Sequence, residues 1–113
     1  MYSKIADRLS LSSAGTFYSE ALEMTGANAV QVDFTVMAWG GTGSLVLNIQ
    51  ESNDCANWSD ALTTSSAGSS TLSSVGYQTF RVLNVGGQMV RVRYVLASAS
   101  SVVVSAGVNT SLM

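Results

Sequence analysis

The chain has 113 residues, a formal net charge of −2, a single cysteine and no proline or histidine. Charged residues make up only 11%, against about 25% in typical soluble domains, so we expect much of the surface to be buried against other proteins. The five basic residues form no extended patch, which argues against nucleic acid as a partner. No apolar run approaches the roughly 20 residues of a membrane-spanning helix, so no membrane contact is expected. Cys55 alone allows neither an intramolecular disulfide nor a cysteine zinc site.

The clearest alternation of apolar and polar residues runs over 29–39. A period of two residues is typical of a half-buried β-strand. The glycine-rich stretch 40–43 interrupts the pattern, which resumes over 44–51. We therefore expect these two segments to form a β-hairpin with a glycine-rich loop.

The C-terminal half repeats this pattern. Segments 77–83 and 88–97 alternate on either side of Gly86 and Gly87, which predicts a second hairpin. A last strand is expected over 101–108, after a serine-rich turn. Two shorter strands are expected earlier in the chain, over 16–19 and 21–24.

About seven to eight short strands with no helical period predict an all-β fold, an antiparallel β-sandwich or jelly-roll-like barrel. Residues 14–113 are assigned to this single domain. Residues 1–13 are expected to form an N-terminal arm or an edge strand. The polar segment 63–74 is expected to be a surface loop or an irregular edge strand. Without proline, the strand edges lack one common guard against pairing with neighbours.

The composition offers little catalytic chemistry. Without histidine, the commonest general base and metal ligand is missing. Glu51, Asp54 and Asp60 lie near one another in sequence and supply oxygen atoms suited to glycosidase chemistry or calcium, but the spacing matches no EF-hand. Asp and Asn in such a loop more often close a turn onto their own backbone. We expect a protein that is not an enzyme, with no cofactor and no metal.

One loop is a candidate ligand site. An indole flanked by amide and carboxylate groups can stack on a sugar ring. The alternative, which we favour, is that Trp58 folds back over the end of the sheet. The candidate residues are Asn53, Asp54, Asn57, Trp58 and Asp60.

Four residues are candidates for an interface. Arg91 and Arg93 lie on the polar side of one strand and are two of only five cations, so we expect each to have a partner. That partner is expected to be Asp33 across a sheet or an acidic residue of a neighbouring subunit. Trp39 has the opposite parity to Phe34, which places it on the surface or at an interface.

Residues 47–60, Leu-Asn-Ile-Gln-Glu-Ser-Asn-Asp-Cys-Ala-Asn-Trp-Ser-Asp, resemble a recurrent pattern in small β-sandwich proteins of tailed bacteriophages. There a strand ends in Gln-x-Ser-Asn-Asp, and Asn-Trp-Ser or Asn-Trp-Thr begins the next element. The likeness extends loosely to the Arg-Val-x-Tyr strand within 80–97 and to the last strand. Glu51 and Cys55 depart from the pattern, since small residues or glycine are more usual at their positions.

The resemblance implies a virion component: a capsid decoration or cement protein, or a small tail or neck subunit. We therefore predict a virion structural protein, made in the host cytoplasm, that forms a homo-oligomer such as a trimer or another ring. Its expected partners are further copies of itself and other virion proteins such as the major capsid protein. The alternative is a carbohydrate-binding β-sandwich module that serves in receptor or glycan adhesion.

Overall fold

The computed structural model describes residues 2–12, 14–60, 69–83 and 85–112, and all regular elements in these ranges are β-strands. The eight strands are β1 (Tyr2–Leu11), β2 (Gly15–Tyr18), β3 (Leu22–Glu23), β4 (Ala29–Ser52), β5 (Ser59–Asp60), β6 (Ser69–Leu72), β7 (Gly76–Val82) and β8 (Met89–Ser111).

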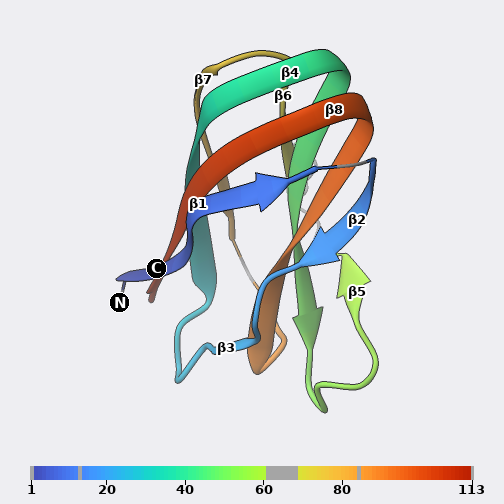
Figure 1. Ribbon diagram of the computed structural model, residues 1–113. Coiled ribbons are helices and arrows are strands. Elements are labelled where there is room, and N and C mark those ends of the chain that lie inside the picture. Colours follow the sequence, from blue (N-terminus) through green and yellow to red (C-terminus); the bar gives the residue numbers. More distant parts are fainter. Residues whose placement is uncertain (1, 13, 61–68, 84, 113) are drawn as a thin grey trace.

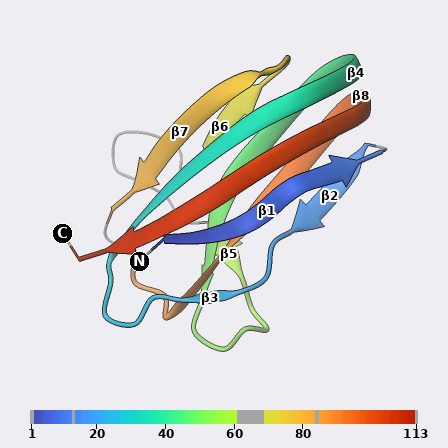
Figure 2. The same ribbon diagram turned by 60° about the vertical axis from the view of Figure 1, so that its left-hand side comes forward.

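The fold is organised around two very long strands. β4 has 24 residues and β8 has 23, and they pair antiparallel from Ala29 with Ser111 to Ser52 with Met89. Both strands bend midway, so that the sheet folds over on itself (Figure 1). The first half of β4 and the second half of β8 form one layer, flanked by β7 and β1. The other halves form the second layer, flanked by β2 and β3 on one side and by β5 and β6 on the other, and Figure 2 shows the shared bend. The predicted antiparallel sandwich or jelly-roll-like fold is confirmed.

The predicted hairpin of 29–39 with 44–51 is wrong, because the glycines bend the strand and do not reverse it. Gly41 and Gly43 have φ angles of 103° and 109°, which favour glycine. The register with β8 also shifts at three places around the bend, as in β-bulges, which increase the local twist of a strand. The predicted serine-rich turn at 98–101 is likewise wrong, since β8 runs through it and stays paired with β4.

The second predicted hairpin, 77–83 with 88–97, is also wrong. β7 pairs with the first half of β4, whereas residues 89–97 of β8 pair with its second half. The connection between β7 and β8 therefore crosses from one layer to the other. Alternation along each segment predicted that both are strands, but it carries no information about which partner each one pairs with.

The shorter elements follow the predictions more closely. β2 and β3 lie at the predicted short strands and pair with β8. Of the two alternatives for the N-terminus, the structure has the edge strand, since β1 pairs with the second half of β8. Within the polar segment 63–74, residues 69–72 form β6, and residues 63–68 lie outside the described part of the chain.

The core lies between the two layers. Alternate residues of β4 are at most 1% exposed in both of its halves: Val30, Val32, Phe34 and Val36 before the bend, and Leu45, Leu47 and Ile49 after it. β8 contributes a matching alternate set. Each layer turns one side toward this core. The other sides of the two layers therefore form opposite outer surfaces of the molecule.

Tyr94 brings a polar atom into this core. It is 1% exposed, and no described residue forms a hydrogen bond with its hydroxyl oxygen. Burial raises the pKa of Tyr94 from 10.0 to about 12, since the charged phenolate is poorly solvated there.

We expect Tyr94→Phe to stabilise the protein by about 1 kcal/mol, because an unpaired buried hydroxyl loses its hydrogen bonds to water. Thermal unfolding should show a melting temperature about 4 °C higher. The folded parent holds the phenol proton more tightly than the unfolded chain, so the parent should lose stability as the pH rises from 10 towards 12 and the variant should lose less. A lower melting temperature at neutral pH would contradict the prediction.

Candidate functional site

Polar and aromatic side chains gather on the outer surface of the second layer. We call this surface the arginine face. It combines residues of β2, the second half of β4, β5 and the first half of β8 with the residue before β5. Its members are Tyr18, Asn48, Gln50, Trp58, Asp60, Arg91 and Arg93.

Arg91 is held on three sides. Its guanidinium carbon lies 4.0 Å from the centroid of the Tyr18 ring and 4.3 Å from that of Trp58, which are distances of cation–π contacts. Its Nε donates a hydrogen bond of 2.9 Å to Oε1 of Gln50, the residue directly opposite on β4. The side chain is therefore fixed by two rings and one amide.

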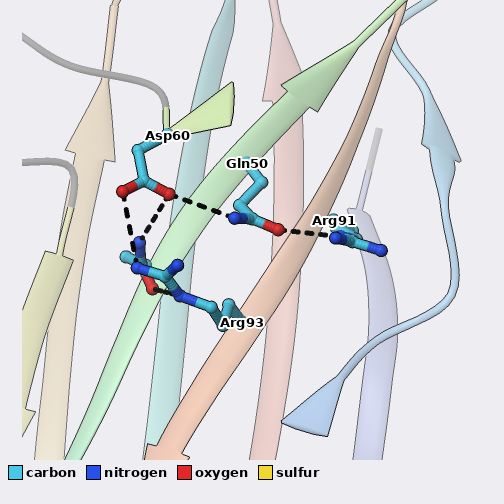
Figure 3. Close-up of polar contacts among 5 residues, drawn as sticks. Gln50, Asp60, Arg91 and Arg93 are labelled. Atoms are coloured by element: carbon cyan, nitrogen blue, oxygen red, sulfur yellow. Dashed lines mark hydrogen bonds and ion pairs between the residues drawn. The ribbon is translucent and has the colours of Figure 1, made fainter. Parts of the chain in front are cut away.

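Asp60 links the second arginine to the same network. Its Oδ2 lies 3.4 Å from Nη2 of Arg93, and its Oδ1 accepts hydrogen bonds from the amides of Asn48 at 3.3 Å and Gln50 at 3.1 Å. Figure 3 shows the resulting chain of contacts, from Arg93 through Asp60 and Gln50 to Arg91.

The two amides at the centre of this network are buried. Asn48 is 8% exposed and Gln50 is 6% exposed. Each donates to Asp60 and accepts from an arginine, because Nε of Arg93 also donates to Oδ1 of Asn48 at 3.0 Å. Buried amides are costly unless they are paired, so this network rigidifies the surface. Such an arrangement is suited to binding by stacking and hydrogen bonding.

The predicted ligand loop divides into two parts. Asn53, Asp54 and Asn57 use their side chains within the structure: Asn53 accepts from the Gln88 backbone at 3.1 Å, and Asn57 donates to Asp54. Backbone N–H groups of Asn57 and Ala56 hold the pKa of Asp54 well below its usual range, as in a turn closed by its own carboxylate. Only Trp58 and Asp60 belong to the arginine face.

The Trp58 ring contacts Arg91, which is bonded to Gln50 on the sheet. This placement agrees with the expectation that Trp58 folds back over the sheet. It is half-buried, however, and so retains some exposed ring.

Asp33 lies on the opposite surface, in the first half of β4. The expected pairing of Asp33 with Arg91 or Arg93 within the chain is wrong: both arginines stand opposite the second half of β4, and the ion pair of Arg93 is with Asp60. Asp33 instead lines a shallow hollow of about 210 Å³. We call this surface the tyrosine face; its residues are Tyr2, Lys4, Asp33, Thr35, Tyr77, Ser105 and Gly107.

Trp39 lies close to the bend of β4. The expectation that it is exposed or at an interface is only partly met, because the indole is half-buried and packs against the core. Its Nε1 donates to the carbonyl oxygen of Gly41 at 3.2 Å.

A larger hollow lies at one end of the sandwich, between residues 23–27 and 85–89, with a volume of about 560 Å³. It is an open depression, and Glu23 is the single charged residue among those that line it. The residues that line this hollow include no aromatic residue and no arginine. We therefore place the candidate functional site on the arginine face.

The described residues contain no cluster of three or more Cys, Asp and Glu side chains close enough to hold a metal ion. They also contain no helix that is long and apolar enough to cross a membrane.

The sequence did not point to Tyr18, Asn48 or Gln50 as site residues. Their only signal was parity, since Asn48 and Gln50 alternate with buried Leu47 and Ile49. Polar residues on the outer side of a strand are common, and only the register that sets Gln50 opposite Arg91 distinguishes these.

No family model and no curated protein matches the sequence. Solved structures do share its fold. The PBSX exported protein XepA superposes with a TM-score of 0.68 at 14% identity, over 100% of this chain, which spans 38% of XepA. The SPBc2 prophage-derived protein YomS gives 0.56 at 12% identity, over 98% of this chain and 92% of YomS. A CBM4 structure gives 0.55 at 14% identity, over 99% of this chain and 70% of that one. At these identities the likeness establishes the β-sandwich fold.

The loop before β5 contains a backbone feature that matters for stability. Cys55 has a φ angle of 60°, in the left-handed region that favours glycine. Its exposed side chain makes no demand on packing.

We expect Cys55→Gly to be more stable than Cys55→Val by about 1 kcal/mol, since a β-branched residue is strained at positive φ. Urea unfolding of the two variants and the parent measures this difference. Equal stability of the two variants would contradict it.

Proposed function

We propose that the chain is a structural protein of a bacteriophage virion, and more specifically a capsid decoration or cement protein. The observation that carries this proposal is a surface poor in charge: 11% of residues are charged, while Tyr2 and Tyr77 are 57% and 59% exposed. Surfaces of this kind are typical of subunits buried in an assembly.

The likeness to the prophage-derived protein YomS supports the proposal, because the superposition covers nearly the whole of both chains. XepA contains the same sandwich. The resemblance of residues 47–60 to small phage β-sandwich proteins points in the same direction. On this proposal, the protein is located in the virion.

The tyrosine face is our candidate for the surface that assembles. It presents two exposed tyrosines around a shallow hollow, and its two charged members, Lys4 and Asp33, have opposite signs. A nearly neutral face rich in aromatic area suits self-association into a trimer or another ring. The same face or the open strand edges would contact the major capsid protein.

We further propose that the protein has no catalytic role. The sequence contains no histidine. On the arginine face, Asp60 is the single carboxylate, and it accepts hydrogen bonds from two amides and pairs with Arg93.

We expect the parent to form a homo-oligomer at micromolar concentration and Tyr77→Lys to raise its dissociation constant by at least about tenfold, because a buried unpaired ammonium is costly. Leu83→Lys is the matched control, since Leu83 is also exposed (42%) but lies outside the hollow. Light scattering with mass analysis measures both. A parent that is strictly monomeric and does not bind capsids would exclude the proposal.

A second function, glycan binding on the arginine face, is favoured by a separate observation. The rings of Trp58 and Tyr18 both contact one guanidinium, next to amide and carboxylate groups. Sugar-binding sites combine aromatic rings with polar groups in this way. The CBM4 likeness agrees with such a role for this fold.

Trp58→Ala should abolish glycan binding and leave the protein folded, since Trp58 is only half-buried. A glycan array identifies the ligand, and circular dichroism checks the fold. Trp39→Phe is the control, because Trp39 packs against the core and is not part of the arginine face. If the parent binds no glycan on the array, this second function fails, and the structural role is unaffected.

A further inference from the structure

We propose that Arg91 is the anchor for a carboxylate-bearing sugar, so that the arginine face selects acidic glycans over neutral ones. This inference rests on the glycan-binding function proposed above and adds the chemical class of its ligand.

The first argument is that Arg91 is already in place. Two rings at 4.0 and 4.3 Å and the hydrogen bond to Gln50 restrict its side chain, and Gln50 is itself fixed by Asp60. A flexible arginine would lose rotamer freedom when it binds a ligand. The Arg91 side chain is already ordered in the folded protein, so less conformational entropy is lost when a ligand binds and the affinity is higher.

The second argument concerns the atoms that remain for a ligand. Arg91 bonds to Gln50 through Nε, and among the described residues Nη1 and Nη2 have no hydrogen-bond partner. Figure 3 shows the guanidinium extending away from Gln50 beyond that bond. Two parallel N–H groups match the two oxygens of a carboxylate, and such bidentate pairs are among the strongest polar contacts in proteins.

The third argument is local charge. The arginine face contains two arginines and one aspartate, and Asp60 is paired with Arg93. The face is therefore positive by one charge in a protein whose net charge is −2. Asp60 is turned to Arg93 and to two amides, so an incoming carboxylate meets Arg91 as the unneutralised charge.

The rings decide in favour of a sugar over an acidic peptide. A carboxylate that binds Arg91 brings its attached group next to Tyr18, which is 51% exposed, and the half-buried Trp58. The apolar face of a pyranose ring suits such aromatic surroundings, and an acidic sugar places its carboxylate directly on that ring. A lone acidic side chain on a flexible stem would use the guanidinium and leave the rings largely uncovered.

Arg81 provides a matched control within the chain. Its Nη2 donates to Oε1 of Gln31 at 3.0 Å, so it too is an arginine paired with a glutamine across two strands. It lies in the other layer, and no ring contact involves it among the described residues. Arg81 therefore has the charge and the glutamine of Arg91 without the two rings.

The experiment titrates the full chain with oligosaccharides of uronic and sialic acids, each compared with its methyl ester, which keeps the sugar and removes the charge. Calorimetry or NMR gives the dissociation constants. We expect the acid to bind at least about tenfold more tightly than its ester, as a charge-assisted bidentate contact predicts. Arg91→Lys, which keeps the charge but not the planar fork, should lose this preference, and Arg81→Lys should retain it.

Each outcome has a distinct meaning. If acid and ester bind equally, or if Arg91→Lys keeps the preference while folded, the inference is wrong and the glycan-binding function stands. If no sugar of either kind binds the parent, both fail. Oligoglutamate that binds as tightly as the sugar acids, in an Arg91-dependent way, would replace the sugar with an acidic protein partner and overturn the inference.

Discussion

The pairing of β4 with β8 is the interaction on which the rest of the structure depends. Every other strand pairs with one of these two, and both layers of the sandwich are made from their halves. The pairing continues through the bend because glycines and bulges absorb the change of direction. Hydrophobic residues on one side of each half then form a single core, to which no helix contributes in the part of the chain that the structure describes.

The same bend produces two outer surfaces of different character from one pair of strands. Before the bend, Asp33 and Thr35 of β4 belong to the tyrosine face, which is nearly neutral and has two exposed tyrosines. After it, Asn48 and Gln50 meet Arg93 and Arg91 across the ladder. The first surface is our candidate for contacts between subunits and the second is our candidate binding site, and both are built from the same two strands.

The sequence predicted most strands but not how they pair. Alternation identified the strands because it depends on each segment alone, as with Val30 to Val36. The first hairpin was wrong because Gly41 and Gly43 are equally compatible with a turn and with a bent continuous strand. The second was wrong because alternation does not tell which strand pairs with which. Of the loop residues singled out from the sequence, Trp58 and Asp60 lie on the arginine face, but their partners Tyr18, Gln50 and Arg91 come from strands far apart in sequence. Only the register brings them together.

The long ladder also has a consequence for how the chain folds. Ser52 and Met89 are the paired residues closest in sequence, and Ala29 and Ser111 are the most distant, so the ladder can close progressively from the first pair to the last. Contacts of such separation are slow to form, since a long loop must be ordered before they stabilise anything. During synthesis, β4 emerges well before β8, so the edge of β4 that pairs with β8 stays open until β8 follows. That interval is when the open edge of one chain is most exposed to pairing with the β8 of another copy.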